Sequence, residues 1–286
     1  MSRASLRRDG RGHREMRGKE LRTSELTQFD GSAWYSQGLT TVVAAVNGPV
    51  AARQEDYRKC GVQVYVNRAV RIPRAGGTDR LCVEEQRVEQ RRMDAEVEMF
   101  LTASIQAVVR LDQFPRCVLE VHVTILADDG ALLSVATNAL MCALLDAGVP
   151  CRTTVAAVSV VAFAPEDGSP VTAPTTTTTT TTAAPEASSL LSSSLPLALL
   201  LDPTRVEEGG DGVRTCATAT FVLSNSTDGS NNSSGGVLVS QLQTCPRSSM
   251  HGGRMSSKDL VGMVALAERA AVSIFSFFRK CNVPLE

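Results

Sequence analysis

The stretch LADDGALLSVATNALMCALLDAGVPCR, residues 126–152, contains a strand end, a turn and a helix in immediate succession. Asp128-Asp129-Gly130 supplies the turn residues, and residues 134–147 are apolar on nearly every side, which predicts a helix buried on most of its faces. Gly148 suits the position just after the helix, and Pro150 prevents its continuation. The stretch therefore predicts a strand that turns into a central helix.

The start of this helix is also a candidate anion site. The first backbone N–H groups of a helix have no partner within the helix, and phosphate groups often bind there. Two interpretations follow: the turn holds a phosphate for chemistry, or it only contributes packing. Asp128 and Asp129 precede the turn and repel a phosphate, while Leu132 and Leu133 follow it and offer no side-chain donor. The surrounding residues favour packing.

Alternating apolar and polar residues predict half-buried strands on the N-terminal side of the central helix. Residues 119–125 alternate most clearly, and residues 62–66 follow the same pattern. Residues 40–46 form a β-branched, apolar run that the turn residues Asn47-Gly48-Pro49 are expected to end. We expect residues 40–46 and 62–66 to form a hairpin across the polar loop 51–59.

Helical spacing of apolar residues predicts two more helices. Residues 84–110 carry an apolar stripe in their second half, whereas the first half is nearly all charged and is expected to project into solvent. In a helix at residues 257–279, Ser256 and Asp259 resemble a capping box. Further strands are expected at 153–163, from 197, at 217–223 and at 237–242. This mixture predicts an α+β arrangement and not a doubly wound parallel sheet.

Charge and complexity are unevenly distributed along the 286 residues, although the net charge is only −1. Residues 1–22 carry eight Lys or Arg residues against three acidic ones, so the N-terminal arm, residues 1–20, is either a polyanion contact or a solvated tail. Residues 164–194, with eight consecutive threonines, and residues 224–236 cannot bury enough apolar area to fold. We expect both to be disordered insertions within a single domain, residues 21–286.

The metal-binding and membrane signals are weak. The eight cysteines are scattered without any Cys-x-x-Cys pair, the three histidines lie far apart, and His122 falls on the polar face of its predicted strand. Zinc needs such ligands gathered at close spacing. We therefore expect reduced thiols, no metal and no cofactor. The N-terminus has no apolar signal-peptide region, and the run 195–201 is too short to span a bilayer, so no membrane contact is expected.

Several segments, in their order and spacing, together resemble RNase PH-type proteins. The resembling segments are Arg8-Asp9-Gly10-Arg11, Glu15, Arg17, Asp30-Gly31-Ser32-Ala33, Gly38-Leu39-Thr40, Gly48-Pro49, Asp129-Gly130, Asn138-Ala139, Asp146-Ala147-Gly148-Val149-Pro150, Leu201-Asp202-Pro203-Thr204, the strand at 220–223 and the aromatic helix end at 274–278. The resemblance implies the α+β RNase PH fold, which is like ribosomal protein S5 domain 2, with two related β-sheet/α-helix halves.

Active members of this family phosphorolyse RNA from its 3′ end, and hold phosphate partly through a Gly-Thr-Arg triplet at the turn before the helix. The aligned triplet here is Ala131-Leu132-Leu133, and the position nearest the family's strand carboxylate is Ala217. A leucine cannot replace the paired donors of an arginine. We therefore expect no catalytic residue. Two alternatives remain: an active phosphate-dependent 3′-to-5′ exoribonuclease, and a stand-alone nucleic-acid-binding protein of the same fold.

The resemblance further implies a subunit of the eukaryotic RNA exosome core ring. Its expected partners are other RNase PH-like ring subunits, S1/KH cap subunits and RNA. Its expected role is RNA processing and degradation, including rRNA maturation, in nucleus, nucleolus and cytoplasm. RNA phosphates need Lys or Arg. The RNA-contact candidates are Arg53, Arg58, Arg68, Arg71, Arg74 and Arg80. Each of them could instead be a solvated arginine or part of an intersubunit salt bridge.

Overall fold

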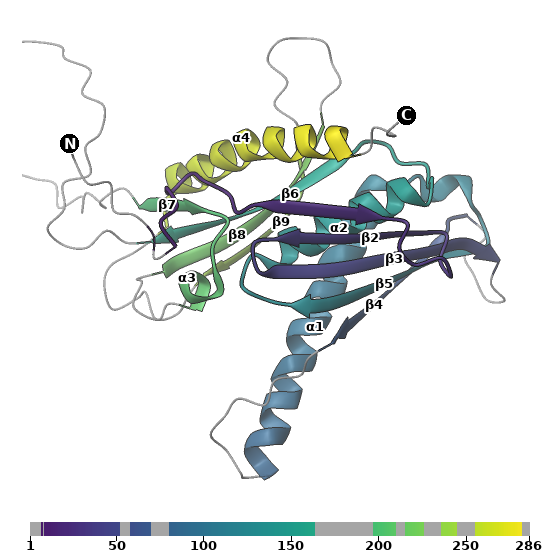
Figure 1. Cartoon of the computed structure of the whole chain (residues 1–286), viewed down its shortest axis with the longest axis horizontal. Helices are drawn as coiled ribbons and strands as arrows, with labels where there is room; N and C mark the ends of the chain where they lie inside the picture. The colour runs from purple at the N-terminus through teal and green to yellow at the C-terminus, as the bar shows by residue number, and fades with distance from the viewer. Residues whose placement is uncertain are drawn as a thin grey trace, which may run out of the picture.

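Two β-sheets enclose the helix predicted from residues 134–147 (Figure 1). The computed structural model describes residues 7, 9–51, 58–69, 80–163, 197–209, 215–225, 236–244 and 255–281. Residues 164–194, most of 224–236, and residues 1–6 and 8 of the basic arm lie outside this description. The predicted insertions and most of the arm's extreme N-terminus therefore stay predictions.

The first sheet has five strands in the order β1-β2-β3-β5-β4. Their bounds are β1 (Lys19–Thr23), β2 (Gly31–Gln37), β3 (Thr40–Ala51), β4 (Gly61–Arg68) and β5 (Cys117–Ala127). In β5 the residues at 119, 121, 123 and 125 are buried and those between them are partly exposed, as the alternation predicts. His122 lies on the partly exposed face and stacks on Tyr65, with ring centroids 5.0 Å apart.

The second sheet has four strands in the order β7-β6-β8-β9. Their bounds are β6 (Val155–Phe163), β7 (Ala198–Leu201), β8 (Thr215–Ser224) and β9 (Val237–Thr244). All neighbours in this sheet are antiparallel. β6 is buried over eight of its nine residues, because helices cover both of its faces.

The helices are α1 (Arg80–Val108), α2 (Leu132–Asp146), α3 (Arg205–Gly209) and α4 (Ser257–Cys281), with a short 3-10 turn at Leu111–Gln113. α2 lies between the two sheets, and α4 covers the outer face of the second sheet (Figure 1). α4 is capped as predicted, because the Ser256 N–H donates to Asp259 Oδ2 at 2.9 Å. By length and composition α4 could also span a membrane, but its apolar stripe packs on β6 and β8.

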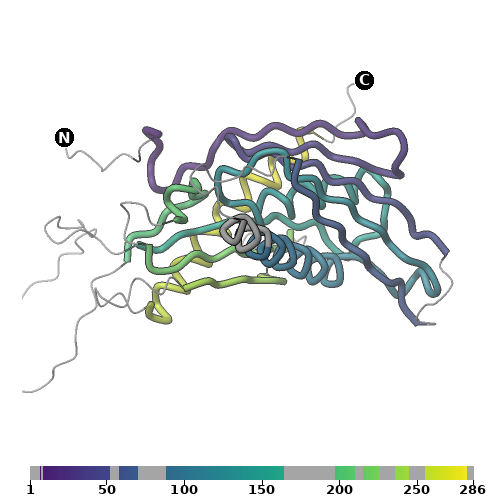
Figure 2. Tube along the Cα trace, turned by 90° about the horizontal axis from the view of Figure 1, so that it is seen from below, coloured from purple at the N-terminus to yellow at the C-terminus, as the bar shows by residue number. Residues whose placement is uncertain are grey.

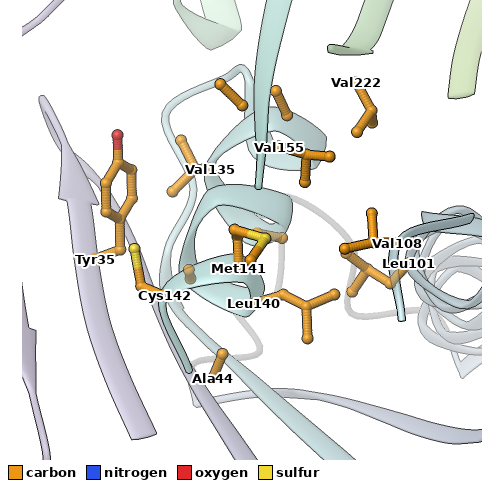
Figure 3. Close-up of a cluster of buried hydrophobic side chains, with 14 of the residues drawn as sticks. Tyr35, Ala44, Leu101, Val108, Val135, Leu140, Met141, Cys142, Val155 and Val222 are labelled. Carbon is orange, nitrogen blue, oxygen red and sulfur yellow. The ribbon is translucent and has the colours of Figure 1, made fainter. Parts of the chain in front are cut away.

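The core is continuous from one sheet to the other through α2. Figure 3 shows Met141 of α2 between Tyr35 of the first sheet and Val222 of the second, with Leu101 of α1 alongside. All four side chains are at most 1% exposed. Burying side chains of this size stabilises the fold by about 1.5–3 kcal/mol each, so α2 joins the two halves into one core.

α1 is buried only in its second half. Burial begins at Val97, whereas Val88 and Met93 are 58% and 46% exposed. Figure 2, in which α1 points toward the viewer, and Figure 1, in which it extends below the sheets, both show the helix leaving the body. The structure thus agrees with the predicted projection of the first half of the helix into solvent over its described residues, 88–96.

The predicted hairpin of residues 40–46 and 62–66 is wrong. β5 lies between β3 and β4, and β4 pairs with β5 in parallel, so α1 forms the crossover that connects them. The expected strand end at Asn47-Gly48-Pro49 is also wrong. β3 continues to Ala51 through a register shift between Asn47 and Val50, so these turn residues form a β-bulge.

Candidate phosphate site at the start of the central helix

The turn before α2 is packed directly against the second half of the chain. Gly130 has φ +90°, and a Cβ there would lie 2.4 Å from the Arg205 nitrogen and 2.5 Å from the Thr204 carbonyl carbon. The Arg205 N–H donates to the Asp129 carbonyl at 2.9 Å. Only glycine permits this approach, because the contacting atoms are backbone and cannot rotate away. The glycine of the quoted stretch therefore fixes the junction between the two halves.

A carboxylate of the chain itself occupies the start of α2. Ala131, in the left-handed conformation with φ 54°, precedes the helix. Its N–H donates to Glu208 Oε1 of α3 at 2.8 Å. The pKa of Glu208 is raised to about 7, chiefly by burial and also by the nearby Asp128, while the Ala131 N–H and Arg17 limit the rise. Glu208 thus lies where an incoming anion would meet this helix.

Arg17 is the central cation of the site and is bound to Asp202. Its Nη2 donates to Asp202 Oδ1 at 2.7 Å, and its Nε and backbone N–H donate to Oδ2 at 3.0 and 2.8 Å. Nη1 and Nη2 also donate to the carbonyls of Asp129 and Gly130, at 3.0 and 3.2 Å. Both side chains are buried, at 7% and 2% exposure. Burial alone would raise the pKa of Asp202, but the Arg17 bonds and charge bring it below its ordinary value.

Other arginines around the turn are also paired with carboxylates. Arg7 donates to both oxygens of Glu207 at 2.8 and 2.6 Å. Arg68 and Arg205 both bind Asp128 Oδ2 at 3.1 Å. Arg68 additionally binds Asp94 at 2.7 Å, and its side chain is 10% exposed. The described arginines here carry positive charge, but the chain's own carboxylates neutralise it.

The degenerate triplet is packed inward. Ala131 is 1% exposed, and Leu132 and Leu133 are partly buried against the core. Ala217 is fully buried within β8, opposite Ala162 and Thr244. Thr215, also of β8, donates its Oγ1 hydrogen to the Glu207 carbonyl of α3 at 2.7 Å. None of these four side chains at 131, 132, 133 and 217 carries a group that could hold phosphate.

Of the six arginines predicted to contact RNA, the described residues include Arg58, Arg68 and Arg80. Arg53, Arg71 and Arg74 lie outside the described residues. Arg58 is exposed before β4, and Arg80 begins the projecting helix α1. Sequence reasoning did not identify Glu208 or Asp202 as members of the site, since their partners Ala131 and Arg17 lie 77 and 185 residues away.

Comparisons with known proteins agree with this architecture. Residues 15–150 match the 3′ exoribonuclease family, domain 1, also called RNase PH. The chain is 28% identical over 281 residues to the exosome complex exonuclease RRP46 homolog of Arabidopsis thaliana, covering 96% of this chain and 94% of that protein. The solved structure of rice (Oryza sativa) Rrp46 superposes with a TM-score of 0.65 at 23% identity, covering 96% of this chain and 98% of that one.

A second group of relatives matches only in part. The exosome complex component Rrp41 of Pyrobaculum calidifontis is 33% identical over 155 residues, which is 54% of this chain and 61% of that protein. The chain thus aligns with about three fifths of the length of these Rrp41 relatives. The sequence motifs at 145–150 and 202–204 resemble the type called ribosomal RNA-processing protein 46, in agreement with the full-length match.

The two-halved α+β fold confirms the fold expected from sequence. The matched segment spans β1, β2, β3, β4, α1, β5 and α2, which include all five strands of the first sheet and the central helix. The full-length relative and the shared fold extend the likeness through the second sheet. The chain therefore has the α+β RNase PH fold, and its residues 15–150 match the RNase PH-type 3′ exoribonuclease family.

Proposed function

We propose that this chain is a non-catalytic, RNase PH-like subunit of the eukaryotic exosome core ring. In this role it forms part of the ring wall and contributes charged side chains to an assembly that processes and degrades RNA from the 3′ end, including the maturation of rRNA. Its partners are other RNase PH-like ring subunits, S1/KH cap subunits and RNA, and it acts in the nucleus, the nucleolus and the cytoplasm. The names of its relatives as exosome components support the assembly part of the proposal.

The single observation that carries the non-catalytic part is the Glu208 carboxylate at the start of α2. Its Oε1 accepts the Ala131 N–H at 2.8 Å, one of the backbone donors that a phosphate would use. An incoming phosphate must displace this carboxylate and then sit beside Asp128 and Asp129. Each of those steps is opposed by like-charge repulsion.

Phosphorolysis makes strong electrostatic demands on a site. A phosphate dianion must approach an RNA chain that is itself a polyanion, so positioned cations and donors must offset the repulsion in the transition state. Here Arg17 is bound to Asp202, and Arg7 is bound to Glu207. The triplet 131–133 adds only methyl and isobutyl groups. This inventory supports a structural role for the turn.

Contact with RNA requires only backbone neutralisation, which tolerates an inactive site. Arg58, Arg80, Arg53, Arg71 and Arg74 remain the proposed contacts. Arg68 is the weakest of the candidates, since Asp94 and Asp128 already bind its guanidinium. Its substitution should therefore alter stability more than RNA affinity.

Affinity purification of the tagged chain from its own cells tests the proposal. The expected result is a particle several times heavier than 30.4 kDa that contains other RNase PH-like subunits and S1/KH subunits. A chain that runs at its own mass, and carries no such subunit at any salt concentration, contradicts ring membership.

A further inference from the structure

Among the strands that the structure describes, each sheet has two edge strands, and three of these four edges are protected. An unprotected edge presents unpaired N–H and C=O groups to any extended chain, so natural proteins cover or charge their edges. β1 carries Lys19, Glu20 and Arg22 among its five residues. On β4, the Val66 N–H donates to Glu98 of α1 at 3.2 Å. On β7, the Leu201 N–H donates to the His13 carbonyl at 2.9 Å.

In the described part of the chain, β9 has none of these protections. Its sequence VLVSQLQT contains no charge and no proline over eight residues. Among the residues that the structure describes, β9 pairs only with β8, and no hydrogen bond joins its outer edge to another segment. Figure 2 shows β9, in yellow-green, along the lower margin of the molecule.

Three apolar side chains of β9 are exposed, alongside the polar Ser240, Gln243 and Thr244. Leu238 and Leu242 are 40% and 46% exposed, and Val237 is 39% exposed. Leu242 lies in register with Ala219 of β8 and Val160 of β6, so it continues the face that α4 covers farther along the sheet. On the opposite face, Val239 packs against the core and holds the strand in place.

We propose that β9 receives an extended strand from a neighbouring subunit, so that the second sheet continues into that neighbour. Main-chain hydrogen bonds at a sheet edge can be completed along eight residues only by another extended backbone, which identifies the occupant as a strand. The absence of charge calls for a partner strand that is itself uncharged and apolar on the face next to Leu238 and Leu242. This inference rests on ring membership, because the ring supplies the neighbour.

Amide hydrogen exchange on the free chain and on the purified ring tests this inference. The expected result is that exchange of part of the Val237–Thr244 amides slows at least tenfold on assembly, because their outward N–H groups become bonded. A double variant L238K/L242K should incorporate at least tenfold less than the wild type, while its circular dichroism and unfolding midpoint stay unchanged. The matched control is V261K/V272K, at two exposed positions of α4 (67% and 61%), which should incorporate normally.

The possible failures are distinguishable. A ring that forms with unchanged exchange at 237–244, or that accepts L238K/L242K as readily as the control, overturns the strand-addition proposal and leaves ring membership intact. A wild-type chain that enters no assembly with RNase PH-like subunits overturns the proposed function, and the partner assigned to β9 falls with it.

Discussion

Replacing Asp202 with asparagine should destabilise the protein by about 3–5 kcal/mol, the range for breaking one buried ion pair. Asp202 is 2% exposed and accepts three hydrogen bonds from Arg17, all at 3.0 Å or less. Asparagine keeps the shape and tolerates the φ of 52° at this position. It removes the charge, however, and places an amide donor where one carboxylate oxygen now faces Arg17.

The two partners should also be strongly coupled. Arg17→Met should cost a similar amount, because it removes the closest cation of the buried Asp202 carboxylate and leaves Arg11 at 3.4 Å. In the double variant R17M/D202N neither charge remains, so the loss should fall short of the sum by about 2–3 kcal/mol. Urea unfolding followed by circular dichroism, for the wild type and three variants, gives this coupling energy.

An exposed pair provides the control for this cycle. Arg22 and Glu20 also form a salt bridge, but their side chains are 57% and 56% exposed, so R22M/E20Q should show a coupling below about 1 kcal/mol. If the Arg17–Asp202 coupling is as small as this control, the buried pair does not hold the two halves together, and the reasoning for the junction is refuted.

Two further predictions concern the same junction. Because the Glu208 pKa rises from 4.5 to about 7 on folding, ionisation of Glu208 destabilises the fold increasingly from pH 4.5 to 7, so E208Q should be more stable than the wild type at pH 8 by up to about 3 kcal/mol and nearly equal to it at pH 4.5. Folding lowers the pKa of Glu207, so E207Q, which loses the ion pair with Arg7, should be less stable than the wild type at pH 8. Urea unfolding midpoints across this pH range test both signs. G130A should cost about 3 kcal/mol or more because its Cβ meets backbone at 2.4 Å, whereas G148A, at φ +66° with open space around it, should cost only the conformational strain of about 1–2 kcal/mol; equal losses in thermal unfolding would contradict the close approach.

Local patterns in the sequence predict much of the fold. The alternation at 119–125 locates β5, and the unbroken apolar run after the turn locates α2, because burial on one face or on all faces leaves a direct periodic signal. β1 and β2 have no comparable signal. β2, GSAWYSQ, is buried at six of seven positions although it includes serine and glutamine, because α2 covers one face and neighbouring strands flank it.

Pairings between distant segments are what the patterns do not predict. The hairpin expected from 40–46 and 62–66 is wrong because closeness along the chain favours pairing of adjacent strands. In the structure α1 connects β4 to the parallel strand β5, which lies between β3 and β4. The candidate site has the same limit. The sequence identifies the loss of the triplet at 131–133, but no local feature connects Glu208 to Ala131 or Asp202 to Arg17.

Phosphate-dependent release of nucleoside diphosphates from poly(A) by the purified chain tests the central claim most directly. Because Glu208 accepts the Ala131 N–H and Asp202 binds Arg17, we expect no more release with phosphate than without it. Raising the phosphate concentration should not change this result. Release that increases with phosphate, and disappears when Arg17 is replaced by methionine in a variant that still folds, would contradict the account.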